Sequence, residues 1–346
     1  MRKLASVQRV EKITEIPNAD RIELAHILGW QCVIKKGEFK AGDKGVYFEP
    51  DSFLPEREEF EFLRKSSFRE NSILGRGFRL RTQKLRGEIS QGLLLPLTIL
   101  PEGKEYTIGD DVTEILGVKK WEEPERAGDV GTFIGSLPDF IHSTDETRVQ
   151  SAPDLFTAFK GKPYYITTKM DGTSCSCGVD AYNEVKYTTH NHSLKDDGKS
   201  TFINLLKRKG IVDNLLRYKE EHPDINTISV QGELCGDGIQ GNHLKLQKLE
   251  WYVFTINING RRVGLHELQA IVKELGAEMV PLEETGDDLT QKYATIEDLL
   301  NRADGEYPNG GKKEGIVIRP IEVSFYNNSP LSMKVINNKY LLKYED

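Results

Sequence analysis

The chain has 346 residues, of which 38% are hydrophobic and 29% charged, so it is not a mainly disordered protein, and its length suggests about two domains. No apolar run approaches the roughly 18 residues of a membrane span, and residues 1–6 contain no apolar signal core. The four cysteines are too few and too scattered for a disulfide scaffold. We therefore expect a cytoplasmic protein that has no membrane partner and acts as a monomer.

The net charge of -7 conceals an uneven distribution. Residues 1–120 contain 21 Lys and Arg against 19 Asp and Glu, a net charge of +2, whereas the remaining residues carry -9. Within the first part, residues 76–86 contain five basic residues and no acid. A polyanion responds to such a local patch rather than to the average charge, so the segment predicts contacts with the phosphates of a nucleic acid. A solvated strand face that happens to be basic is the alternative. The basic residues are Arg76, Arg79, Arg81, Lys84 and Arg86.

The first part of the chain reads as short strands separated by turns rich in Gly, Asp and Pro. The clearest strands are expected at residues 30–34, 45–49, 78–81 and 92–97. Several short strands with turns between them favour a small β-barrel or sandwich over residues 1–120. Residues 121–140 lack periodicity and are rich in breakers, so we expect a linker there.

From residue 141 to 346 the pattern changes to mixed strand and helix, which predicts a second domain. Strands are expected at residues 164–169, 316–318 and 333–336. A helix is expected over residues 201–219, interrupted at Gly210, and another over 265–275, ended by Gly276 as a C-terminal cap.

The sharpest motif of this second part is Lys169-Met170-Asp171-Gly172, at the end of an apolar strand. A lysine followed by an acid and a glycine turn can place an amine in a pocket, where a lowered pKa would make it a nucleophile. Taken alone, the motif equally fits a surface β-turn with Asp-Gly at its centre.

Further candidate site residues follow Lys169 along the chain: acids, an aromatic strand and a second lysine. A lone glutamate, Glu233, ends an apolar strand, and an aromatic strand around Phe254 comes next. A second glutamate, Glu314, precedes a strand, and Lys334 lies within the last apolar strand. Each has an ordinary reading, because acids at strand ends are common, aromatic strands are usually core and lysines beside apolar residues often snorkel.

Together these motifs resemble the covalent nucleotidyltransferases, the superfamily of polynucleotide ligases and mRNA capping enzymes. The resemblance is closer to ATP-dependent RNA ligases of the Naegleria and Deinococcus type, which carry an N-terminal OB domain. It covers nearly the whole chain, and its further matches include residues 30–39, 80–91, 109–116, 144–150 and 239–242. The fold it implies is α+β: an OB-like β-barrel at 1–120, a linker at 121–140, and a nucleotidyltransferase domain of antiparallel sheets with flanking helices at 141–346.

The resemblance also implies a reaction and the residues that perform it. Lys169 would attack the α-phosphate of ATP, and the AMP would pass to an RNA 5′-phosphate before a 3′-hydroxyl seals the strand, in RNA repair. Lys334 would contact the α-phosphate and, with a bound Mg²⁺, lower the pKa of Lys169. Asp171, Glu233 and Glu314 would hold hydrated Mg²⁺ (or Mn²⁺) through water, although Glu233 could contact the ribose instead.

Further roles follow from the same resemblance. Phe254 would stack on adenine, and Arg148 would engage the triphosphate. Two departures concern phosphate contacts: Ser332 stands where the family usually has the first lysine of Lys-x-Lys, with Lys339 or Lys343 as candidate replacements. His190 stands where an arginine is usual and would contact the nucleic acid with a charge that depends on pH. The loop at 320–330, before the lysine strand, is also longer than the family pattern has it.

Two alternatives compete with this interpretation. Residues 84–93 are similar to OB-type tRNA-binding domains, so the protein could bind RNA without ligase activity; the complete lysine and carboxylate set argues against that. An ATP-dependent DNA ligase or a GTP-dependent capping enzyme would place an OB domain after the lysine strand. Only 12 residues follow Lys334, so we expect neither.

Overall fold

A computed structural model describes residues 2–122, 130–143 and 145–344. The chain divides into two compact units. The first comprises Met1–Glu125, Val149–Pro153 and Leu341–Asp346, and the second comprises Arg126–Arg148 and Asp154–Tyr340.

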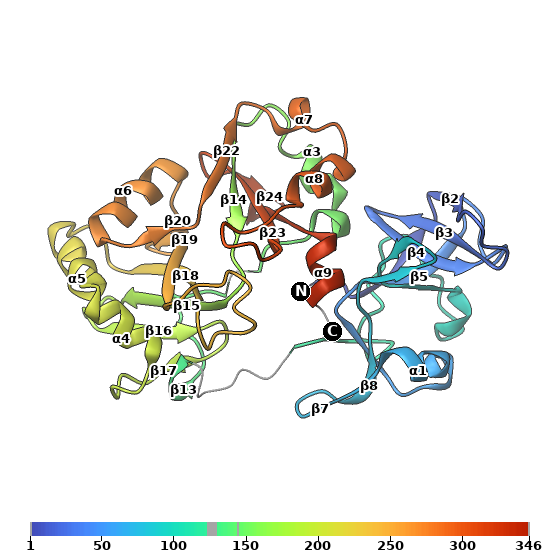
Figure 1. The fold of residues 1–346 in the computed structure, drawn as a ribbon, viewed down its shortest axis with the longest axis horizontal. Helices are drawn as coiled ribbons and strands as arrows, with labels where there is room; N and C mark the ends of the chain where they lie inside the picture. The colour runs from blue at the N-terminus through green and yellow to red at the C-terminus, as the bar shows by residue number, and fades with distance from the viewer. Residues whose placement is uncertain (1, 123–129, 144, 345–346) are drawn as a thin grey trace. The chain divides into compact units, whose positions relative to one another are not determined.

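The first unit, blue to cyan in Figure 1, is built from short antiparallel strands. One sheet has the order β1 (Ala5–Arg9), β5 (Lys44–Phe48) and β11 (Leu93–Leu95), and a second has β2 (Lys12–Glu15), β3 (Ile22–Ile27) and β4 (Trp30–Lys35). A third has the order β12 (Lys119–Lys120), β6 (Ser52–Pro55), β8 (Gly75–Arg79) and β7 (Phe68–Asn71). The hairpin of β9 (Gln83–Leu85) and β10 (Glu88–Ser90) forms a separate two-stranded sheet, and β10 contacts β4. The strands expected at 30–34, 45–49 and 92–97 are confirmed within a few residues.

Apolar side chains from these strands form the core of the first unit. Val7, Val46 and Phe48 are fully buried, and Phe48 meets Phe60 edge to face at a ring-centroid distance of 5.6 Å. Phe60 comes from the short helical segment η1 (Glu58–Leu63), which precedes α1 (Arg64–Ser67). Aromatic pairs of this geometry add to the hydrophobic gain, so this contact stabilises the core of the first unit.

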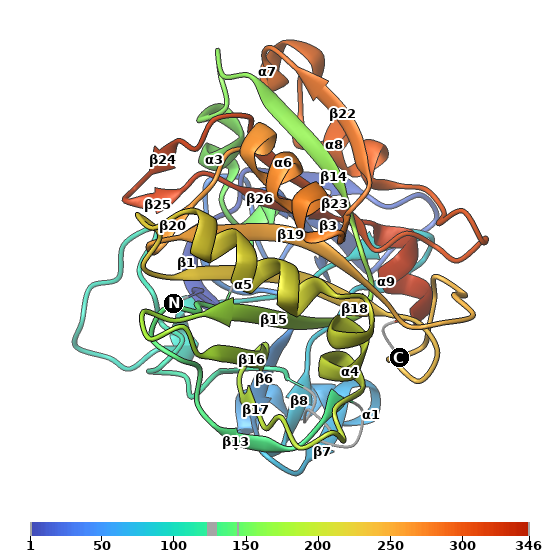
Figure 2. The same ribbon diagram turned by 90° about the vertical axis from the view of Figure 1, so that its left-hand side faces the viewer.

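The larger sheet of the second unit has the strand order β13-β17-β16-β15-β18-β19-β20, with β21 beside β19. Figure 2 shows α5 and α6 lying across one face of this sheet. Buried residues of the helices and strands form one hydrophobic cluster, which includes Leu206, Leu215 and Trp251. The bounds are β13 Phe133–Gly135, β15 Thr173–Val179, β16 Val185–Thr189, β17 Ser193–Leu194, β18 Ile228–Cys235, β19 Glu250–Ile258, β20 Arg261–Arg262, β21 Glu278–Met279, α4 Thr201–Arg208, α5 Ile211–Glu221 and α6 Leu265–Leu275.

The helix ends follow the residues that predicted them. Ser200 caps α4 by accepting a hydrogen bond from the Ile203 amide. Gly210 adopts a positive φ of 71° between α4 and α5, so the predicted interruption is confirmed. Gly276 ends α6 with a φ of 65°, as the sequence predicts.

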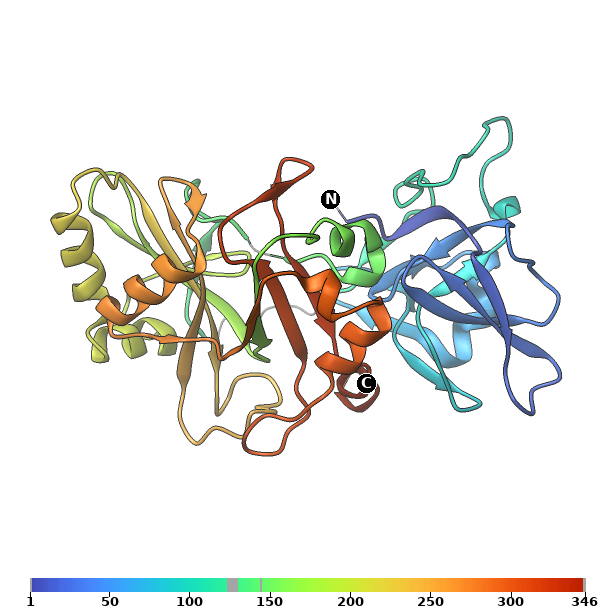
Figure 3. The same cartoon turned by 90° about the horizontal axis from the view of Figure 1, so that it is seen from above.

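A second sheet of this unit has the order β22-β14-β23-β26, and all its neighbouring strands are antiparallel. Helix α8 lies against β26. Figure 3 shows the red hairpin of β24 and β25 projecting from the unit; it lies within the loop that the sequence marks as extended. The bounds are β14 Tyr164–Lys169, β22 Leu282–Gly286, β23 Gly315–Pro320, β24 Phe325–Tyr326, β25 Ser329–Pro330, β26 Met333–Ile336, α3 Pro153–Thr157, α7 Leu289–Lys292, α8 Ile296–Ala303 and α9 Asn338–Tyr344.

The predicted linker at 121–140 is only partly described. Residues 123–129 lie outside the described residues, whereas Phe133–Gly135 form β13, which pairs with β17 at the edge of the large sheet. The α+β fold class is confirmed, with an antiparallel β-rich N-terminal part and helices flanking sheets in the second unit.

Candidate active site

Lys169 lies at the end of β14, where the strand leaves the second sheet. Its neighbour across β23 is Gly315, so Glu314 is brought beside it. The Nζ of Lys169 lies 2.8 Å from the carboxylate oxygens of Glu314. The sheet therefore joins two predicted site residues that are 145 positions apart in sequence.

Tyr307 holds these two residues in register. Its hydroxyl donates a hydrogen bond of 2.8 Å to the Lys169 carbonyl oxygen and accepts one of 3.1 Å from the Glu314 amide. The side chain is 4% exposed, so water does not compete for these bonds. Tyr307 thus fixes the backbone on both sides of the ion pair.

The turn after Lys169 brings Asp171 and Glu233 to the same region. A Cβ on Gly172 would lie 2.3 Å from the Leu234 carbonyl oxygen and 3.0 Å from Glu233, so only glycine allows β18 to approach this closely. Asp171 is buried and hydrogen-bonds to His243. This local geometry explains why the motif needs an Asp-Gly pair.

The three carboxylates set the charge state of the lysine. Burial alone would lower the pKa of Lys169, but the negative charges of Glu314, Glu233 and Asp171 outweigh it and raise the pKa above its usual value. Burial, with the nearby Glu314 and Asp171, raises the pKa of Glu233 to about 8 against the opposing effect of Lys169. The predicted lowering of the Lys169 pKa depends on a bound cation as well as on Lys334, so it stays a prediction; the protein side chains alone raise this pKa.

Lys334 lines the other wall of the site, and the backbone of Arg148 pairs with it, although Arg148 itself is buried and is not among the residues that line the pocket. The Lys334 amide donates to the Thr147 carbonyl oxygen at 2.9 Å, which pairs the segment carrying Arg148 with β26. Burial lowers the pKa of Lys334, with Lys169 and Arg148 adding to the effect and Asp145 opposing it through an ion pair. Two predicted phosphate-binding cations are thus adjacent.

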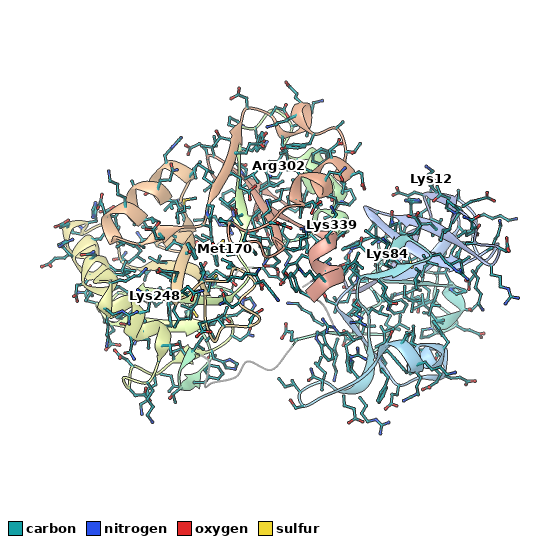
Figure 4. The ribbon with its side chains drawn as sticks, viewed as in Figure 1. Lys12, Lys84, Met170, Lys248, Arg302 and Lys339 are labelled. Atoms are coloured by element: carbon teal, nitrogen blue, oxygen red, sulfur yellow. The ribbon has the colours of Figure 1, made fainter. Side chains whose placement is uncertain are left out.

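A pocket of about 210 Å³ opens between these walls. Lys169, Glu233, Phe254 and Lys334 all line it. Figure 4 labels Met170, another lining residue, in the interior of the second unit. The aromatic ring, the amine, the carboxylate and the second cation therefore face one cavity, the size and chemistry of a site for a small ligand.

The acidic group suits a hydrated divalent cation better than a tightly ligated one. Within residues 2–122, 130–143 and 145–344, no three His, Cys, Asp or Glu side chains are arranged to hold an ion directly. Magnesium sheds its water reluctantly and is often held through it, so Asp171, Glu233 and Glu314 need not converge on one point. The raised pKa of Glu233, caused by burial and by neighbouring acids, marks an excess of negative charge that a cation would relieve.

Three residues of the site were missed by the sequence reasoning: Asp145, Tyr307 and His243. Asp145 pairs with Lys334, Tyr307 bonds to Lys169, and His243 bonds to Asp171. None lies in a pattern that stands out locally, and their partners are 189, 138 and 72 positions away. For Asp145, the matched segment 144–150 offered the single sequence signal.

His190 and Ser332 are the two departures from the family pattern. His190 lines the pocket, and its ring nitrogens lie 3.0 and 3.3 Å from the Ser143 hydroxyl. Ser332 does not face a candidate replacement lysine: it donates to Glu146, whereas Lys339 pairs with Asp304. The expectation that Lys339 replaces the missing lysine is not supported by its position.

The basic segment of the first unit does not form one continuous face. Arg76 is exposed and pairs with Glu56 at 3.1 Å, whereas Lys84 and Arg86 are exposed on the β9–β10 hairpin. Arg81 is half-buried. Arg79 is 9% exposed, with its guanidinium 4.9 Å from the centroid of the Trp121 ring, so its predicted role as an exposed phosphate contact is wrong. Alternation along the strand could not reveal the aromatic partner that covers it.

Comparisons with known proteins agree with this architecture. A family profile described as an OB-fold domain matches residues 4–97, and the profile of the family RNA ligase matches residues 162–336. The RNA ligase of Naegleria gruberi with PPi superimposes with a TM-score of 0.88 at 36% identity, covering 100% of both chains. A lysine-to-alanine variant of the same enzyme, with ATP and Mn, gives 0.86 at 34% identity, and a glutamate-to-alanine variant with AMP and Mn gives 0.85 at 34%; each covers 98% of both chains.

The OB-fold domain, the ligase domain and the lysine pocket define a polynucleotide ligase. Within that class, the chain belongs to the RNA ligase family. The search of curated proteins gave no match. Across the part of the chain that the structure describes, no helix is long and apolar enough to cross a bilayer.

Proposed function

We propose that this protein is an ATP-dependent RNA ligase that joins 3′-hydroxyl and 5′-phosphate ends through a lysyl-AMP on Lys169, and that it acts in RNA repair. The observation that carries the proposal is the single pocket lined by Lys169, Glu233, Phe254 and Lys334. Its similarity to the Naegleria enzyme with ATP and Mn supports ATP as the nucleotide and a divalent metal as the cofactor.

In the first step, deprotonated Lys169 attacks the α-phosphorus of ATP. The Nζ–P bond forms as the bond to the bridging oxygen breaks, pyrophosphate leaves, and the nitrogen releases one proton to solvent. Phe254 stacks on adenine, while Lys334 and Arg148 neutralise charge on the phosphates. Asp171, Glu233 and Glu314 would hold a hydrated Mg²⁺ or Mn²⁺, which would supply positive charge to the phosphates and favour the neutral amine.

The ion pair with Glu314 affects whether Lys169 is protonated or neutral. Glu314 lies 2.8 Å from the Lys169 Nζ, and its charge raises the pKa of Lys169. An amine that keeps its proton cannot attack phosphorus. A cation held by the carboxylates would compete for Glu314 and would favour the neutral amine.

The next two steps move the AMP and seal the strand. An oxygen of the RNA 5′-phosphate attacks the adenylate phosphorus, the P–N bond breaks, and the lysine takes up a proton. The 3′-hydroxyl of the other end then attacks the activated 5′-phosphorus and releases its proton to solvent, AMP leaves, and a phosphodiester remains. Each step is an in-line displacement, in which positioning and charge stabilisation dominate.

The proposal assigns the two halves of the chain different tasks. Residues 141–346 carry the chemistry, residues 121–140 link them to residues 1–120, and the latter form an OB domain that binds RNA. Arg76, Lys84 and Arg86 supply its exposed charge. His190 lies at the pocket and contacts the RNA end.

Labelling with the nucleotide tests the first step. With Mg²⁺, we expect α-labelled ATP to label the wild-type protein and to leave Lys169→Ala unlabelled. Label from GTP but not ATP would instead indicate a capping enzyme. Absence of an adduct with either nucleotide, or an adduct that survives in Lys169→Ala, would contradict the mechanism.

A further inference from the structure

A second pocket, of about 460 Å³, adjoins the nucleotide pocket in the same unit. The two share Asp145 and Glu146 as a common wall, and Asp145 is the residue that pairs with Lys334. A ligand in the second pocket would therefore lie one side chain away from the proposed α-phosphate site.

The second pocket carries one permanent cation among its described lining residues, Arg262. The Arg262 side chain is 15% exposed, and its Nη2 lies 3.8 Å from a Glu146 oxygen. Burial and the neighbouring Arg319 lower the pKa of Arg262 to about 10, so the guanidinium stays charged at neutral pH.

Glu146 has closer partners than Arg262. Arg319 donates to Glu146 at 2.5 Å, and Ser332 also donates to it. A lysine in place of Ser332, as the family pattern has it, would add a cation at this wall; the serine adds only a hydroxyl. Arg262 is thus positioned to supply positive charge beside the position where the usual lysine is missing.

Several of the remaining lining side chains are polar and carry no permanent charge. Gln231 and Asn257 contribute amides, Ser143 and Ser329 contribute hydroxyls, and Tyr326 contributes a ring. Such groups can hydrogen-bond to a ribose and to base edges, and an aromatic ring can stack on a base. Tyr326 belongs to the projecting β24–β25 hairpin, whose neighbouring Phe325 side chain is 65% exposed.

The lining residues of the second pocket fit a nucleotide of the RNA strand better than they fit pyrophosphate. Pyrophosphate carries several negative charges and needs several cations, whereas this pocket offers one arginine against two carboxylates in the shared wall. A nucleotide within a strand carries one phosphodiester charge, which one arginine can match.

We propose that the second pocket binds a nucleotide at the RNA end, with Arg262 on its phosphodiester, and so positions that end beside the adenylate on Lys169. The inference rests on the proposed ligase function and goes beyond it by assigning a subsite for RNA to the catalytic unit. The second pocket would bind the RNA end after AMP has been attached to Lys169. It therefore acts in AMP transfer and sealing but not in the attack on ATP.

The test separates the reaction steps in the full-length protein. For Arg262→Gln, we expect lysyl-AMP formation from ATP within about twofold of wild type, and an RNA concentration for half-maximal transfer raised about tenfold or more, the usual effect of one charge-assisted hydrogen bond. The slope of log affinity against log salt should fall by about 0.7, as for one lost contact to a single strand. Arg262→Lys should restore part of the affinity.

Arg261→Gln is the matched control, because Arg261 is the exposed neighbour on the same two-residue strand. It makes the same charge change and should leave all steps unchanged. Asn257→Asp, nearly isosteric, should also weaken RNA binding by placing a carboxylate in the pocket, and thereby checks the site independently of Arg262.

Two results would overturn the inference while leaving the ligase function intact. Arg262→Gln could match wild type in every step, or it could slow lysyl-AMP formation while sealing pre-adenylylated RNA normally, which would assign the pocket to the triphosphate. A wild-type protein that forms no lysyl-AMP would defeat the proposed function, and this inference with it.

Discussion

At the scale of single residues, the site depends on how Lys169 is held rather than on its presence alone. The ion pair with Glu314 and the hydrogen bond from Tyr307 fix the amine and the backbone behind it. The carboxylates that would bind a cation also raise the pKa of Lys169. A cation that offset their charge would favour the neutral, nucleophilic amine.

Replacing Tyr307 by Phe tests this positioning. The variant would leave the Lys169 carbonyl and the Glu314 amide each without one hydrogen bond, so we expect the rate of lysyl-AMP formation to fall about tenfold. Rapid-quench labelling with ATP measures this rate. Tyr293→Phe removes a hydroxyl that bonds to Glu284 instead and should keep the wild-type rate. A normal rate in Tyr307→Phe would show that its hydroxyl does not position the nucleophile.

At the scale of elements, Glu146 ties together strands that frame both pockets. It accepts from Arg319 on β23 and from Ser332, which precedes β26, and it lies near Arg262 on β20. Burial would raise its pKa, but Arg319 and Arg262 hold the pKa at about 2. The stability from this lowered pKa is fully present above the ordinary carboxyl pKa and is lost as pH falls through about 2.

Glu146→Gln should consequently destabilise the protein in a pH-dependent way. At pH 7 we expect a loss of about 3 kcal/mol in the free energy of unfolding, because Arg319 is left with an uncompensated buried charge. The difference from wild type should shrink as pH falls from about 4.5 towards 2, where wild-type Glu146 also becomes neutral. Urea unfolding followed at several pH values measures it. A difference that is independent of pH would contradict the ion-pair account.

Hydrophobic patterning predicted the elements better than it predicted the site. The strands at 164–169 and 333–336 and the helix at 265–275 have the predicted bounds, because each is set by local periodicity and by a local breaker such as Gly276. The prediction that the Arg79 side chain is exposed was wrong, because the ring that covers it belongs to Trp121, 42 positions away in the sequence. The partners of Lys169, Asp171 and Lys334 likewise come from distant segments, which periodicity alone does not bring together.

At the scale of the whole molecule, the charge asymmetry follows the two units. The acidic excess of the second part includes the carboxylates around Lys169, and the weakly basic first part contains Lys84 and Arg86 exposed on one hairpin. An acidic protein can still bind a polyanion, because binding depends on the local patch. The OB domain is thereby expected to influence RNA affinity and not the chemistry at Lys169.

The double variant Lys84→Glu/Arg86→Glu tests this division. We expect RNA affinity and sealing at low RNA concentration to fall about tenfold or more, with a weaker salt dependence, while lysyl-AMP formation stays near wild type. Gel-shift titration and ATP labelling measure the two properties. The exposed pair Lys35 and Lys36, at the end of β4, provides a charge-matched control. Equal loss of labelling and sealing in the hairpin variant would refute the division.

The central claim is that AMP on Lys169 is an intermediate in RNA joining. The direct measurement isolates wild-type protein labelled from α-labelled ATP, removes free nucleotide, and adds RNA with 5′-phosphate and 3′-hydroxyl ends together with Mg²⁺ in a single turnover. We predict that the label moves from the protein to the RNA 5′ end and is then released as AMP while joined RNA accumulates. Label that stays on the protein, or joined RNA that appears without this transfer, would contradict the account.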